Sequence, residues 1–373
     1  MNTMEIFGLT QNQSGIMYSL ERMMVERDIK ANAKDTIYKK YWLEKWMERL
    51  GGETSMPYTQ DETLMRAIQL ESEQSPNKTW FYIAMLEASL FCAYTPFSAP
   101  KDADKDETKK IKDENKHFQK LKYSDQADFL KKVAKESGIM EPEYVDRFRK
   151  TYRKTIDKLT GRRTKAALGA VGILATAGIG GALAAIYAGP IAVSLVGGSF
   201  AGVHGAALTG MSLAFIGGGS LAAGGAGVAG GVAVIAGGGA ILGVATGGAT
   251  VTAVGALLKE DPAFALTQAA KLEVVLKEII LNAQQDVQNA QAVMEGLRSQ
   301  IQQQQAELDK MLQEQEKDKQ AIANMKKSLD YLRKAYMDMG KFKSAYEIGM
   351  EIAEEESEDA DVEVAAEEKE NEE

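Results

Sequence analysis

The stretch AALGAVGILATAGIGGALAAIYAGP at residues 166–190 opens a long apolar region, which ends in AILGVATGGATVTAVGALL at residues 240–258. Between Lys165 and Lys259 the chain holds no Asp, Glu, Lys or Arg over 93 residues, and most of its 35 glycines lie there. A helix needs about 20 apolar residues to span a bilayer. Residues 166–258 therefore predict a glycine-rich transmembrane block of two or four helices.

The glycines of this block favour close helix packing in lipid. Glycine costs about 1 kcal/mol relative to alanine inside a soluble helix. In lipid, small residues four positions apart let helix backbones approach each other. The predicted packing residues are Gly198, Gly202, Gly227, Gly231, Gly239, Gly243 and Gly247. His204 is interpreted as a neutral histidine rather than a proton relay, and a soluble form that inserts when triggered is the alternative to stable insertion.

A basic amphipathic helix is predicted directly before the block, from Pro142 to Gly161. Aromatic and aliphatic residues recur on one face and basic residues on another, so the helix either packs in a core or lies on anionic lipid. By the positive-inside rule this end is cytoplasmic, and both termini are then expected in the cytoplasm. The predicted headgroup contacts are Arg147, Lys150, Lys154, Lys158, Arg162, Arg163 and Lys165.

The front of the chain predicts a bundle of short helices over residues 1–95, which is a candidate site for a protein partner. Its tryptophans, Trp42, Trp46 and Trp80, are expected in the core rather than on a binding platform. Residues 96–115 contain few apolar side chains and predict a mobile charged linker. Residues 116–165 continue with helices that lead into the apolar block.

The rear of the chain, residues 259–340, carries a 4-3 apolar repeat that is typical of a coiled coil. At about 1.5 Å per residue the repeat predicts a rod roughly 90 Å long. Its partner is either a second copy, which would make a homo-oligomer, or residues 111–135 folded back. The predicted seam is formed by Leu276, Ile280, Val287, Met294, Leu297, Ile301, Leu308, Ile322, Leu329 and Leu332, with polar residues at Gln304, Gln315 and Asp318. Residues 341–373 are strongly acidic and are expected to be a disordered tail.

A search for catalytic motifs is negative. The GxGxxG pattern at residues 225–230 follows no predicted strand and has no acidic residue about 20 positions later, so it is rejected as a nucleotide site. Two histidines and one cysteine cannot form a common zinc site. The basic residues adjoin the apolar block, where anionic headgroups explain them as well as nucleic acid does. We therefore expect no enzyme, no cofactor, no metal and no nucleic-acid partner.

The expected all-α plan resembles the α-helical pore-forming proteins, in which an apolar segment between helical arms enters the membrane on activation. The matching parts are residues 142–160, 166–258 and 263–336. The resemblance implies a membrane-inserting oligomer that permeabilises a bilayer. Because the N-terminus MNTMEIFGLTQNQSG is not a classical signal peptide, an intracellular toxin or defence effector is expected. The alternative is a membrane-anchored coiled-coil scaffold that recruits partners.

Overall fold

The computed structural model describes residues 9–50, 56–97, 104–161, 211–212, 258–259, 262–313 and 318–370. Every regular element in these residues is a helix, which confirms the all-α class. The N-terminal part holds α2 (Gln11–Ala31), α3 (Thr36–Arg49), α4 (Asp61–Gln74), α5 (Thr79–Leu90), α6 (Lys105–Phe118), α7 (Ala127–Ser137) and α8 (Tyr144–Thr160). The C-terminal part holds α15 (Pro262–Val274), the π-helix η5 (Val275–Ala283), α16 (Val287–Gln313) and α17 (Lys319–Glu370).

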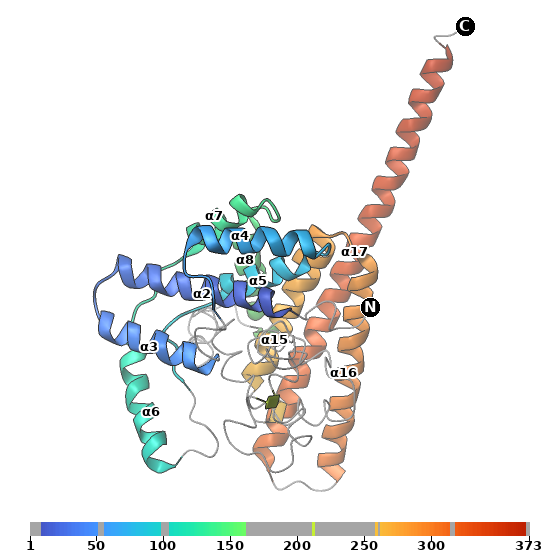
Figure 1. The fold of residues 1–373 in the computed structure, drawn as a ribbon. Helices are drawn as coiled ribbons and strands as arrows, with labels where there is room; N and C mark the ends of the chain where they lie inside the picture. Colours follow the sequence, from blue (N-terminus) through green and yellow to red (C-terminus); the bar gives the residue numbers. More distant parts are fainter. Residues whose placement is uncertain are drawn as a thin grey trace.

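The N-terminal helices share a core rich in aromatic rings, in which Trp46 contacts Tyr18, Trp42 and Phe91. Figure 1 shows how α2 to α8 are arranged, with α6 below α3. α2 starts with a capping box, in which the Thr10 hydroxyl accepts from the Gln13 amide and the Gln13 side chain accepts from the Thr10 amide. The three tryptophans are buried, which confirms that they are core residues. α5 is buried along almost its whole surface and forms the centre of this part.

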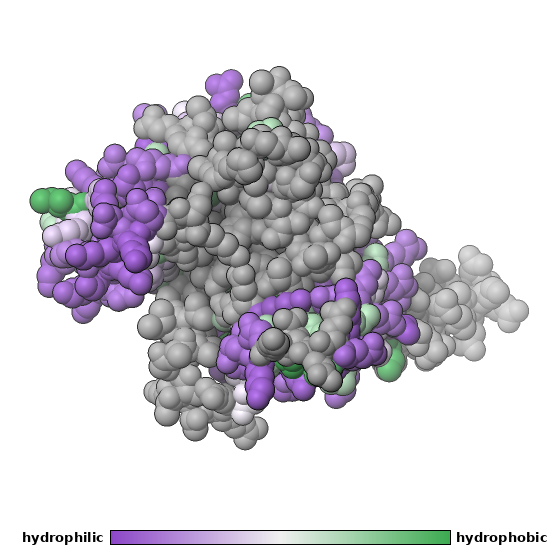
Figure 2. Space-filling model, turned by 90° about the horizontal axis from the view of Figure 1, so that it is seen from below, coloured by the Kyte–Doolittle hydropathy of each residue, from purple (hydrophilic) through white to green (hydrophobic). Residues whose placement is uncertain are grey.

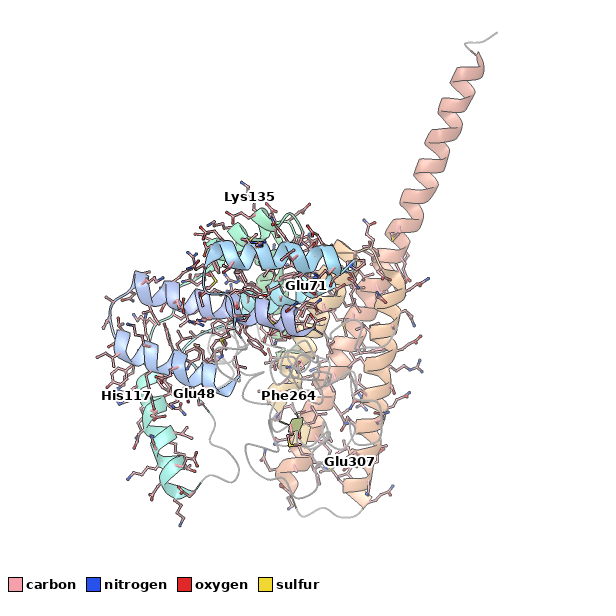
Figure 3. The ribbon with its side chains drawn as sticks, in the orientation of Figure 1. Glu48, Glu71, His117, Lys135, Phe264 and Glu307 are labelled. Atoms are coloured by element: carbon pink, nitrogen blue, oxygen red, sulfur yellow. The ribbon has the colours of Figure 1, made fainter. Side chains whose placement is uncertain are left out.

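The segment predicted as a mobile linker contains α6, so that prediction is wrong for residues 105–115. Asp104 caps the helix by accepting from the Glu107 amide. The Tyr41 hydroxyl donates to Glu114 at 2.6 Å and ties α6 to α3. His117, labelled in Figure 3 beside α3, stacks on Tyr38 with ring centroids 4.5 Å apart. Contacts from neighbouring elements therefore order a charged helix that has little core of its own.

The prediction of one continuous coiled-coil rod over residues 259–340 is also wrong, because two breaks divide this region. The first break follows η5, where Gln285 takes a left-handed conformation (φ 54°) and the Asp286 carboxylate accepts from the Asn289 amide near the start of α16. The second precedes α17, where Asp318 accepts from the Ala321 amide. Both aspartates act as helix caps, so Asp318 starts a helix instead of lying in a seam.

The rear helices instead fold back on each other within the chain. Lys259 pairs with Glu307 at 2.9 Å, and Asn324 donates to the Lys259 carbonyl, so the start of the rear region lies beside the end of α16 and the start of α17. α16 is therefore antiparallel to both α15 and α17. α17 continues to Glu370 and extends well beyond the other helices in Figure 1, where a disordered tail was expected. Residues 354–370 are rich in Glu and Ala and contain no Gly or Pro, which suits a helix.

The helices that flank the apolar block run in opposite directions. Gln284 donates to Thr79 and Lys271 to Glu87, so α5 is antiparallel to α15 and η5. Tyr82 contacts Tyr144 and Arg149 donates to the Ser89 carbonyl, so α8 runs parallel to α5. α8 is thus antiparallel to α15, and the end of α8 faces the same way as the start of α15.

Apart from residues 211–212 and 258, the predicted membrane block lies outside the described residues, and so do its seven packing glycines and His204. Within the described ranges, no helix combines the length and the apolar character needed to cross a bilayer. Seen from below in Figure 2, the described surface beside α3 and α6 and over the C-terminal helices is mainly hydrophilic.

Candidate functional site

The most unusual chemistry in the described residues is a group of ionisable side chains buried where α2, α5, α8 and α15 meet. We call it the buried charge cluster. α5 connects its parts, because it packs against α2, α8 and η5. The members are Tyr18, Glu21, Glu87, Tyr152 and Lys271.

Glu87 and Lys271 form the ion pair of this cluster. The Lys271 ammonium donates to Glu87 Oε2 at 2.8 Å, and each side chain is only 1% exposed. A buried pair gains strong Coulomb attraction but loses the hydration of both charges, so its net contribution to stability is small. Removing one partner is much more damaging, because the other charge is then left in the core.

Glu21 is a second carboxyl in the same place and is fully buried. Neither of its oxygens has a hydrogen-bond donor among the described residues. Burial raises the pKa of Glu21 well above its usual range, the Glu87 charge raises it further, and Lys271 lowers it in part. Two carboxyls share one ammonium, so the cluster is electrically neutral only when one carboxyl is protonated, and Glu21 is the group that burial favours for that role.

Two tyrosine hydroxyls complete the buried charge cluster. Those of Tyr18 and Tyr152 are buried and have no hydrogen-bond partner among the residues that the structure describes. Burial raises the pKa of both phenols, and the nearby carboxylates raise it further, so both remain neutral. The cluster therefore contains hydroxyl groups and a carboxyl that can exchange hydrogen bonds if the helices move.

A second buried ionic site is centred on Asp28 of α2. Its carboxylate accepts from the Lys39 ammonium and the Tyr94 hydroxyl, both at 2.6 Å, and from the Ser124 amide at 2.9 Å. Burial alone would raise the pKa of Asp28, but these hydrogen bonds outweigh it and lower the pKa below its usual value. Unlike the buried charge cluster, this site is balanced, with one anion for one cation. It joins α2, α3 and the segments before α6 and α7.

The basic helix α8 packs in the core rather than presenting its apolar face to lipid. Tyr144, Phe148 and Ile156 are buried, which favours the first of the two interpretations drawn from the sequence. Of the predicted headgroup contacts, two are paired with the C-terminal helices. Arg147 binds Glu278 at 2.7 Å, with Thr151 donating to the same carboxylate, and Lys158 pairs with Asp338. Lys150 and Lys154 are exposed, whereas Arg162, Arg163 and Lys165 lie outside the described residues.

The predicted oligomer seam is covered by the chain itself. Seven of its positions are buried among α15, η5, α16 and α17, and the other three are partly buried against the same core. Phe264 in Figure 3 lies at the start of α15 in this core, and Glu307 lies on α16. The buried seam positions are Leu276, Ile280, Met294, Leu297, Leu308, Leu329 and Leu332, and the partly buried ones are Val287, Ile301 and Ile322.

Part of the buried charge cluster was visible in the sequence. Glu87 is the only charged residue of α5 (TWFYIAMLEASL), and Lys271 follows nine uncharged residues of α15. Isolated charges in apolar helices are usually paired in the core. Glu21 stands beside Arg22 in a mixed helix and carries no such signal. In the described ranges, no group of three His, Cys, Asp or Glu side chains could hold a metal ion.

Cys92, directly after α5, offers a simple check of this packing. Burial raises the pKa of its thiol to about 11. Because the thiolate is the reactive form, we expect the native protein to react with a thiol reagent at pH 7.5 roughly 100-fold more slowly than the denatured protein. A spectrophotometric thiol assay with and without denaturant measures both rates, and similar rates would contradict the packing around α5.

Comparison of the chain with protein-family models, with curated protein sequences and with solved structures gave no match.

Proposed function

We propose that this protein inserts residues 166–258 into a membrane and permeabilises it, with the charged helices as a folded body outside the bilayer. The observation that carries the proposal is the uncharged 93-residue segment between two antiparallel helices. α8, which precedes the segment in the chain, ends on the same side of the folded body on which α15, which follows it, begins. This arrangement supports an even number of crossings, with both termini in the cytoplasm.

Oligomerisation would take place inside the membrane rather than through the rear helices. The seam residues are used within the chain, so the GxxxG-spaced glycines of the apolar segment are the remaining candidates for contacts between copies. Exposed Lys150 and Lys154 on α8 lie close to the start of the segment in sequence and are available for anionic headgroups. An intracellular toxin or defence effector is the role that suits such a device.

A membrane-anchored scaffold is the second candidate. The observation in its favour is α17, which extends beyond the body (Figure 1) and offers a long acidic helix to a partner. In that case the apolar segment would be an anchor, and its sequence would matter only for its length and hydropathy.

Dye release from liposomes separates the two candidates. We expect the full-length protein to release dye from vesicles that contain anionic lipid, and to do so only with its native sequence at residues 166–258. The matched control replaces this segment by the same number of unrelated transmembrane helices. Flotation with the vesicles first establishes that both proteins bind. Equal release by both proteins, or none by either after binding, would contradict permeabilisation and support the scaffold.

A further inference from the structure

The buried charge cluster contains one more carboxyl than its single ammonium can neutralise. Glu87 already accepts from Lys271 at 2.8 Å, whereas both oxygens of Glu21 lie in the core without a donor among the described residues. An ionised carboxylate in that position loses its hydration and gains no hydrogen bond, which is far more costly than burying the neutral acid. The folded arrangement therefore depends on a proton at Glu21.

We propose that this cluster is a proton-dependent latch: it holds α2 and α5 against α8 and α15 while Glu21 is protonated, and it loosens when Glu21 loses its proton. Its consequence rests on the proposed function, because α8 and α15 are the helices that flank residues 166–258. Loosening the latch would free α8 and α15 from α2 and α5. The apolar segment between them could then enter the bilayer.

Each element around Glu21 contributes a group to this balance. Lys271 is the cation, Glu87 is the competing anion, and the tyrosines are neutral because burial raises the pKa of their phenols. Two other buried carboxyls have donors of their own, since Glu71 accepts from Gln13 and Glu273 Oε1 from Lys277, although Glu273 Oε2 has no donor among the described residues. The facing groups are Tyr18 on α2, Glu87 on α5, Tyr123 before α7, Tyr152 on α8 and Lys271 on α15.

The direction of the pH response follows from where the proton is held more tightly. The pKa of Glu21 is raised by burial in the closed state and returns toward its ordinary value when the helices separate. Opening therefore releases a proton and is favoured as the pH rises. A single proton changes the opening equilibrium by up to about tenfold per pH unit between the two pKa values. Glu87 acts in the same direction, because burial raises its pKa while Lys271 opposes the rise.

Hydrogen exchange of the full-length protein tests the latch. Exchange rates in α2 and α5 are measured by mass spectrometry from pH 5 to pH 9, corrected for the intrinsic rate at each pH, with α16 as the internal reference. We expect protection in wild type to fall by up to about tenfold per pH unit over part of this range. Glu21→Gln mimics the protonated acid, so its opening should release about one proton fewer than that of wild type, and its protection should depend less on pH. Glu44→Gln, at an exposed position on α3, is expected to follow wild type.

A second variant and a second assay make the result decisive. Glu21→Met, which fills the same space without a polar group, is expected to behave like Glu21→Gln. A pH dependence that is unchanged in both variants, or absent from wild type, would overturn the latch. Dye release is followed in parallel, and it should increase with pH in wild type and stay low in both variants. If the pH dependence of protection changes when Glu21 is replaced but no dye is released at any pH, the latch is supported and the proposed permeabilisation is contradicted. If dye is released but the pH dependence of protection is the same with and without Glu21, only the latch is contradicted.

Discussion

Replacing Lys271 by methionine is expected to lower the free energy of unfolding by about 3–5 kcal/mol at pH 7. Methionine fits the space of the lysine stem, so the loss comes from charge rather than from packing. In wild type the Lys271 ammonium lies 2.8 Å from the Glu87 carboxyl. Without it, Glu87 is fully buried beside Glu21 and has lost its cation. One of these groups must then be ionised without a partner or take up a proton at neutral pH. Urea denaturation followed by circular dichroism measures the change.

The control for this prediction separates charge from packing. Lys271→Met combined with Glu87→Gln removes the stranded charge, so much of the lost stability should return. Lys150→Met, at an exposed position on α8, should change stability by less than about 0.5 kcal/mol. If Lys271→Met is no worse than the double variant, Glu87 does not depend on Lys271 for its charge compensation, and the account of the buried charge cluster is wrong.

The helical class and most N-terminal helices could be predicted because their signals are local. Periodic apolar positions define one face of each helix, and Gly138 and Gly161 end α7 and α8 in the left-handed conformation. α6 was missed because its order depends on Tyr41 and on the backbone of Phe97, which bonds with Asn115. Such contacts join residues far apart in the chain, and a local pattern does not contain them.

The rear helices show why periodicity alone gave the wrong shape. A heptad repeat continues across the breaks at Gln285 and before Asp318, because three helices around a shared core need the same apolar spacing as a continuous rod. The local signals were the two capping aspartates. The seam packs against helices of the same chain. The apolar spacing of one helix does not show whether its partner is a second copy or a helix that folds back.

The buried charge cluster could be predicted only in part for the same reason. The isolated charges of Glu87 and Lys271 indicate burial and pairing, but 184 positions separate them in the chain. Glu21 becomes notable only when α2 is placed against α5. The excess carboxyl is therefore a property of the tertiary structure, whereas the long uncharged segment is a property of the sequence itself.

The Asp28 site should behave in the opposite way to Glu21 when the pH changes. Asp28→Asn is expected to lower the free energy of unfolding by about 3–5 kcal/mol at pH 7, because it leaves the Lys39 ammonium buried without a counter-charge. The hydrogen bonds lower the pKa of Asp28 in the folded state, so its contribution to stability is present above the unfolded pKa of about 3.9 and is lost as the pH falls through the folded value.

Urea denaturation of wild type and Asp28→Asn at pH 7 and at pH 3 checks both parts of this prediction. The difference in stability should shrink at the lower pH, where wild type also begins to lose the charge. Asp113→Asn is the matched control, because Asp113 pairs with Lys116 on the exposed surface of α6, and its loss should change the stability far less than Asp28→Asn does. A difference for Asp28→Asn that stays constant with pH would mean that packing, and not the charge, makes Asp28 important. Acid would therefore weaken the Asp28 site while keeping Glu21 protonated. The N-terminal part should thus be loosened at low pH through Asp28 and at high pH through Glu21.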